Sequence, residues 1–206
     1  MAPALAELHV GDDPELWSDL GFDVDEGVCR LGGVAVHLTG SGSGEGIHAW
    51  GWRGAASSFG GGVATYTVSS EEPVEGAVHA NSAVRVFYVV LFGPSWAEAD
   101  AAMRAFGCHG GEPARMGSDE RSMLRSLAPA GGPEIEVIGP PEHVPHRRWQ
   151  LWGTIIEVAD IDTTAAVLGD RLRAVKPAMQ PGRRIATLDS SAGSSVAMAF
   201  ISGRED

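Results

Sequence analysis

The sequence is poor in basic residues. Its 206 residues contain 15 lysines and arginines against 27 aspartates and glutamates, which gives a net charge of -12. Such a surface repels phosphate backbones and anionic lipids. The only runs of adjacent basic residues are the arginine pairs at 147–148 and 183–184. We therefore expect a partner that is neither a nucleic acid nor a membrane.

Cysteines and long apolar runs are also scarce. Cys29 and Cys108 have no CxxC spacing and cannot build a disulfide framework, which favours a reducing compartment. The longest apolar run, residues 86–92, is too short to cross a bilayer. The N-terminal residues lack the basic and apolar regions of a signal peptide, so we expect a cytoplasmic protein.

One pattern occurs three times along the chain. An apolar strand leads to an acidic or hydroxyl residue at a turn, and an amphipathic helix follows. A repeated supersecondary unit predicts one architecture built by stacking copies, with a cavity between them. The three copies are the strand at 4–10 with the helix from 14, the strand at 84–92 with the helix at 95–106, and the strand at 153–159 with the helix at 162–172.

Further strands complete these units. The first copy continues into strands at 24–31, 34–38 and 47–52, which makes a β-α-β-β-β module. In the middle we expect strands at 63–68 and 135–138 and a short helix at 119–127, and in the last copy strands at 183–188 and 196–201. This predicts a first module at 1–56, a degenerate middle module or insertion at 57–145, and a last module at 146–206, all within one compact domain.

Three stretches resemble the vicinal oxygen chelate superfamily, which includes glyoxalases and bleomycin-resistance proteins. These are residues 8–22, with their Leu-Gly-Phe ending, and residues 157–162 and 177–187. The resemblance implies an α+β fold of repeated β-α-β-β-β modules that form an open barrel of curved sheets around a cavity. It also implies a small-molecule ligand and a homodimer.

In metal-dependent members of that superfamily, the first and fourth strands of each module hold a divalent ion. The resemblance places the first-strand ligand seven residues before the start of each helix. Counting back gives Ala6, Tyr88 and Gly153, none of which suits the usual divalent ions. We therefore predict no metal site and no cofactor.

An alternative stays open for the first strand. If Asp12 rather than Asp13 starts the first helix, Leu5, Glu7 and His9 face inward, because strand side chains alternate. In that case Glu7, His9, His48 and Glu157 could converge on one cavity and bind a metal ion there.

His48, Glu157 and His9 are the candidates for acid-base catalysis. Imidazole titrates near neutrality, and burial raises the pKa of a carboxyl group. Each also has a plainer interpretation. A strand histidine often bonds to a backbone carbonyl, and Glu157 could be an ordinary exposed strand residue.

Four residues are candidates for ligand binding. Trp50 and Trp52 alternate along a strand and share one face, which is either a cavity wall or a core packing face. Tyr88 lies in the middle copy. Arg183 could hold a carboxylate or enolate, or could pair with one of the many acidic residues of this chain.

Two functions fit these observations. The first is a metal-independent enzyme, of the cyclase, isomerase or lyase type, that acts on a small hydrophobic or polyfunctional metabolite of bacterial secondary metabolism. The second is a non-catalytic protein that binds and sequesters a small molecule such as an antibiotic.

Overall fold

A computed structural model describes residues 2–55, 59–69, 75–118 and 122–204. The first part of the chain forms a strand, a short helix and then further strands. Pro14 opens the helix and Asp13 is its N-cap residue, so Asp13 and not Asp12 starts it. The elements are β1 (Ala4–Val10), α1 (Pro14–Asp19), β2 (Val24–Asp25), β3 (Val28–Leu31), β4 (Val34–Leu38), β5 (Ile47–Arg53) and β6 (Ala64–Thr67).

The middle of the chain repeats this order. Ser95 caps α2 by accepting a hydrogen bond from the backbone N–H of Glu98, and Gly107 ends the helix in the left-handed region. The helix expected at 119–127 is wrong where it can be compared, because residues 123–127 belong to a strand, while 119–121 lie outside the described ranges. The elements are β7 (Ala83–Phe92), α2 (Trp96–Phe106), β8 (Ala114–Met116), β9 (Met123–Pro129) and β10 (Glu134–Gly139).

The last part has a third strand-helix unit. Asp160 caps α3 by accepting from the N–H of Asp162. The helix ends at Leu168 and not at 172, because Gly169 has a positive φ and breaks it. The elements are β11 (Gln150–Val158), α3 (Ile161–Leu168), β12 (Lys176–Pro177), β13 (Arg184–Thr187) and β14 (Ala197–Ser202).

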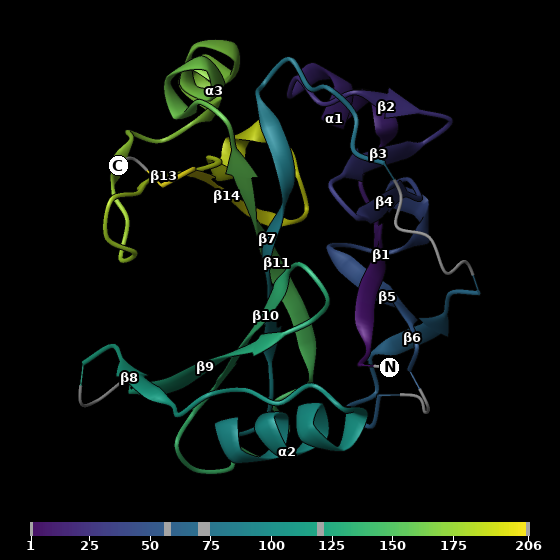
Figure 1. Cartoon of the computed structure of the whole chain (residues 1–206), viewed down its shortest axis with the longest axis vertical. Helices are drawn as coiled ribbons and strands as arrows, with labels where there is room; N and C mark the ends of the chain where they lie inside the picture. Colours follow the sequence, from purple (N-terminus) through teal and green to yellow (C-terminus); the bar gives the residue numbers. More distant parts are fainter. Residues whose placement is uncertain (1, 56–58, 70–74, 119–121, 205–206) are drawn as a thin grey trace.

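These strands form one large curved sheet that does not close (Figure 1). β7 and β11 run antiparallel through its middle, flanked by β10, β9 and β8 on one side and by β14, β13 and β12 on the other. β1 lies between β4, which is parallel to it, and β5, which is antiparallel. Only the pair Leu151 and Ile47 joins β11 to β5. The expected α+β class with an open curved sheet is confirmed.

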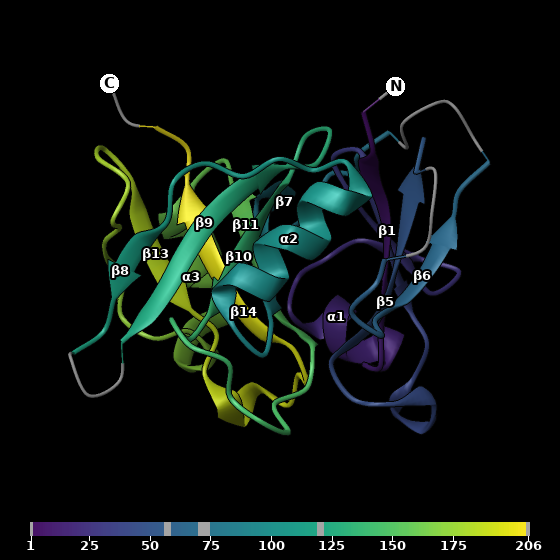
Figure 2. The same cartoon turned by 90° about the horizontal axis from the view of Figure 1, so that it is seen from below.

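The helix α2 packs on β7, β9 and β10, and its C-terminal end reaches the N-terminal strands (Figure 2). Its Phe106 ring packs edge-on against Trp52, with ring centroids 5.0 Å apart. Trp50 meets Phe59 in the same way at 5.2 Å. These large side chains anchor a core that runs across all three strand-helix units. No helix within the described ranges combines the length and the apolar character that a bilayer crossing requires.

Candidate functional site

Four titratable side chains gather on the outer face of the N-terminal strands. We call Glu7, His9, His37 and His48 the histidine face. On β1, Leu8 and Val10 are buried in the core while Glu7 and His9 are partly exposed, as strand alternation requires. On β4 the same alternation places His37 outward between two buried residues, Val36 and Leu38.

A β-bulge sets which residues of β1 share that face. Leu5 pairs with Trp52, and Glu7 pairs with its neighbour Gly51, so Ala6 is the extra residue. Leu5 therefore packs in the core, whereas Glu7 and His9 point to the other side. The alternative that put Leu5, Glu7 and His9 on one face is wrong for Leu5.

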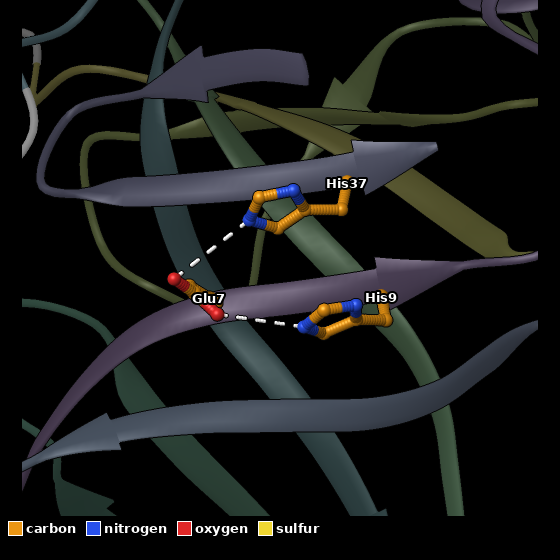
Figure 3. Close-up of side chains that lie close together, drawn as sticks. All are labelled: Glu7, His9 and His37. Atoms are coloured by element: carbon orange, nitrogen blue, oxygen red, sulfur yellow. Dashed lines mark ion pairs between the residues drawn. The ribbon is translucent and has the colours of Figure 1, made fainter. Parts of the chain in front are cut away.

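His9 and His37 are direct neighbours, because they are in register on the parallel strands β1 and β4. Their rings are stacked with centroids 4.8 Å apart and planes 16° from parallel. Figure 3 shows both rings turned toward Glu7. The His9 Nε2 atom lies 3.4 Å from Glu7 Oε2, and the His37 Nε2 atom lies 3.8 Å from Glu7 Oε1.

The two Nε2 atoms are buried and make no hydrogen bond with any residue that the structure describes. The rings themselves are accessible at their edges, since the side chains of His9 and His37 are 23% and 34% exposed. Buried polar atoms without partners are uncommon in folded proteins and mark positions where a ligand or ion can bind. The histidine face holds two of them, both directed at one carboxylate.

Small residues on both sides give the Glu7 carboxylate its space. Ala35 on β4 and Gly51 on β5 are its cross-strand neighbours. A Cβ atom at Gly51 would lie 2.8 Å from Glu7 Oε2, which is too close for a real contact. The absence of a side chain at Gly51 is therefore a condition for the present position of Glu7.

His48 joins the face through a second register shift. His9 pairs with Ala49, but Val10 pairs with Ile47, so His48 is an extra residue on β5. Its ring centroid lies 6.3 Å from that of His9.

Hydrogen bonds fix the tautomer of His48. Thr39 Oγ1 donates its hydrogen to the Val10 carbonyl at 3.0 Å, so it must accept from His48 Nε2, which is also 3.0 Å away. The lone pair of a neutral His48 then resides on Nδ1. Within the described part of the chain, no donor is hydrogen-bonded to that atom. His48 is thus arranged to accept a proton at Nδ1.

The pKa of His9 is lowered, chiefly because burial penalises the charged ring and also because His37 is nearby, while Glu7 partly offsets both effects. His9 is therefore neutral near pH 7, with a nitrogen lone pair available. Tyr66 extends the face: its ring centroid is 5.2 Å from that of His9, and the residue is 52% exposed.

Glu157 and Arg183 lie elsewhere. Glu157, on β11, forms ion pairs with Arg85 on β7 and with Arg183, whose Nη1 atom is 2.7 Å from Glu157 Oε1. Both guanidinium groups also lie over the Phe87 ring. The alternative in which Glu157 converges with the histidines is therefore wrong. Arg183 pairs with an acidic neighbour, which is the second of the two alternatives for this residue.

The aromatic candidates are buried. Trp50 and Trp52 have no exposed surface, so core packing rather than a cavity wall describes their position. Tyr88 is also buried, and burial raises the pKa of its phenol; Gln180 Nε2 donates to its hydroxyl oxygen at 3.2 Å. None of the three lies in the histidine face.

Sequence reasoning missed His37. A signal was present, since His37 alternates with Val36 and Leu38 just as His9 alternates with Leu8 and Val10. The register that brings the two histidines together depends on the parallel pairing of β1 with β4, which the sequence alone does not give.

No protein-family model matches the chain, and no curated protein matches it. Among solved structures, a variant of 4-hydroxymandelate synthase from Streptomyces coelicolor aligns with a TM-score of 0.64 and 16% identity, over 100% of this chain and 95% of that one. At this identity the similarity shows the fold alone, and it agrees with the glyoxalase-like fold of open curved sheets that was expected from the sequence. Methylmalonyl-CoA epimerase from Mycobacterium tuberculosis aligns with a TM-score of 0.47 and 14% identity, over 60% of this chain and 91% of that one, which is too weak to carry an argument.

Proposed function

We propose that this protein is an enzyme that transfers protons on a small molecule at the histidine face. The observation that carries the proposal is the arrangement of His48, whose Nε2 atom is engaged by Thr39 and whose Nδ1 atom is left to act as a base. A general base needs a fixed ring and a lone pair that a substrate can reach. The histidine face supplies both.

The neighbouring groups support such chemistry. A cluster of polar side chains lies beside His48, namely Glu7, His9 and His37. The exposed Tyr66 ring, next to His9, offers a flat surface to a ligand. Isomerisation, cyclisation and elimination next to a carbonyl all begin with removal of a C–H proton. We therefore propose reactions of this type. Glu157 has no part in them, because its carboxylate is engaged by two arginines.

Hydrogen–deuterium exchange tests the proposal before the substrate is known. Acetylacetone, tetralone and pyruvate each carry an acidic C–H next to a carbonyl, and they differ in apolar surface. Incubated with the protein in D2O, at least one should exchange faster than it does in buffer, as followed by proton NMR. The His48→Gln variant should lower that rate at least about 100-fold. The His109→Gln variant is the matched control, because His109 is an exposed histidine outside the face.

A second function, ligand sequestration, is favoured by one observation. Trp152 on β11 is 50% exposed beside a small cavity of about 150 Å³, which is lined by apolar groups of Val90, Ala197 and Met198. Under this alternative, tetralone would bind, Trp152→Ala would weaken the binding, and the ligand would be recovered without deuterium. That combination of results would exclude the enzyme proposal for the ligands tested.

A further inference from the structure

We infer that Glu7, His9 and His37 form a binding site for a divalent transition-metal ion. Each residue offers one ligand atom, and the three atoms lie within 4.8 Å of one another. The inference deepens the proposed function, since it concerns the same face of the sheet. Its test, however, measures metal binding without any substrate.

The donor set suits such an ion. Two imidazoles and one carboxylate are the protein ligands of many catalytic zinc sites, and the same set binds iron(II) in oxygenases. An ion held by these three ligands keeps coordination positions open for water or a substrate oxygen. Hard ions such as Mg²⁺ prefer oxygen ligands, so the site favours a first-row transition ion over magnesium or calcium.

The spacing is close to what a metal needs. Bonds of about 2.0–2.2 Å in a tetrahedral site place the ligand atoms roughly 3.3 Å apart. The 3.4 Å between His9 Nε2 and Glu7 Oε2 meets this requirement. His37 Nε2 lies 3.8 Å from the other oxygen, Glu7 Oε1, and one ligand atom from each residue gives a set within 4.8 Å, so the side chains must move together to bind an ion. Binding would require the two stacked rings to turn slightly, which their exposed edges allow.

An independent observation points to a ligand at this place. The Nε2 atoms of His9 and His37 are buried, aimed at the carboxylate, and without a hydrogen bond in the described structure. A metal ion would satisfy both lone pairs at once. Without an ion, the two nitrogens have only their ion-pair contacts with Glu7, and the two imidazoles stack over each other.

The site differs from the positions that the family resemblance indicated. Those positions were Ala6, Tyr88 and Gly153, on first strands. Here the ligands come from β1 and from β4, the third long strand of the first unit. The expectation of no metal was drawn without His37, which supplies the third donor.

The proposed ion has a clear place in the chemistry. It would hold a substrate oxygen and draw electron density from an adjacent C–H bond. His9 would then be a ligand, and the proton would pass to Nδ1 of His48.

Titration with Co²⁺ and Zn²⁺ tests the site. The chelator-treated wild-type protein should bind one equivalent of Co²⁺ with a visible absorption band, and Zn²⁺ should displace the Co²⁺. The Glu7→Gln and His37→Gln variants should each bind at least about 100-fold more weakly. The His109→Gln variant should bind as the wild type does.

Thermal melts without metal show whether each variant is folded. If either Glu7→Gln or His37→Gln fails to fold, the other variant still tests the site. The inference is overturned if the wild type binds no more Co²⁺ than a metal-free buffer control, or if folded Glu7→Gln and His37→Gln proteins bind as the wild type does. Failure of the proposed enzyme activity would look different. In that case Co²⁺ would bind as expected and no ketone would exchange its proton.

Discussion

His9 and His37 face each other across two parallel strands, with ring centroids 4.8 Å apart and both Nε2 atoms turned toward Glu7. Neither nitrogen has a hydrogen-bond partner in the described structure. Residues paired in register on adjacent strands are held at a fixed spacing by the sheet. The backbone, and not a flexible loop, therefore sets the geometry of this pair.

A substitution at Gly51 tests whether the neighbouring strand determines the position of Glu7. A methyl group at this position would lie 2.8 Å from Glu7 Oε2 and would push the carboxylate aside. We predict that Gly51→Ala weakens Co²⁺ binding at least about tenfold, as loss of an orienting contact does. The control is Gly60→Ala, since nothing lies within 4 Å of a Cβ atom there. Equal affinity in both variants would contradict the placement of Glu7.

Asp12 is predicted to be important for stability. This buried carboxylate accepts hydrogen bonds from Trp17 Nε1, from Ser194 Oγ, and from the backbone N–H and hydroxyl of Ser195. It therefore ties the first strand-helix unit to the last. In Asp12→Asn, an amide N–H₂ replaces one acceptor and leaves donors unpaired. We expect a loss of about 3 kcal/mol in the free energy of unfolding.

Urea denaturation measures that loss. The matched control is Asp13→Asn, because Asp13 is exposed and accepts one backbone hydrogen bond, from Ser41. The Asp13→Asn protein should lose much less stability than the Asp12→Asn protein. Similar losses in the two variants would show that the buried network does not hold the two units together.

His79 should make stability depend on pH. Burial lowers the pKa of this ring below its ordinary value of 6.5. Its Nδ1 atom accepts from the backbone N–H of Asp23 at 2.9 Å, and its Nε2 atom donates to the Arg30 carbonyl. Protonation of Nδ1 would break the first bond. The contribution of neutral His79 to the free energy of unfolding is thus complete above pH 6.5. It is lost as the pH falls through the lowered pKa of the folded state.

Denaturation curves of wild type and His79→Gln, measured from neutral to mildly acidic pH, check this prediction. His9 is present in both proteins, so the difference between them isolates His79. The variant should be less stable at neutral pH, and the difference in the free energy of unfolding between the two proteins should become smaller on acidification. A gap that stays constant would mean that His79 remains neutral or does not contribute.

The two cysteines should be unreactive in the folded protein. Burial raises the pKa of the Cys108 thiol to about 11 and raises that of Cys29 further. Because the thiolate is the reactive form, iodoacetamide should modify neither residue of the native protein at mildly alkaline pH. Both should react in denaturant. Rapid labelling of the native protein, detected by mass spectrometry, would show that the segments around these residues open readily.

Much of the fold could be predicted because its strands and helices follow from local sequence patterns. Alternating apolar residues indicated β1, β4 and β5, and an acidic or hydroxyl residue at the turn marked the start of each helix. The helix expected at 119–127 failed for a physical reason. Met123, Leu124 and Leu127 are good helix formers, but pairing of β9 with β10 overrides this weak preference.

The site was harder to predict because it depends on register and on bulges. His9 and His48 were recognised as candidates, yet the bulges at Ala6 and His48 decide which residues share their face. One alternative placed Glu157 near them. On β11 only Leu151 pairs in register with β5. Further along, β11 pairs with β7, and this pairing places Glu157 opposite Arg85.

Proton NMR of the Co²⁺-loaded protein tests the histidine site most directly. High-spin Co²⁺ shifts the ring protons of any imidazole that binds it far outside the normal spectral range. We predict two sets of shifted imidazole signals in the wild type, from His9 and His37, and one set in His37→Gln. A spectrum without shifted imidazole signals, or one that His37→Gln leaves unchanged, would contradict a metal site on the histidine face.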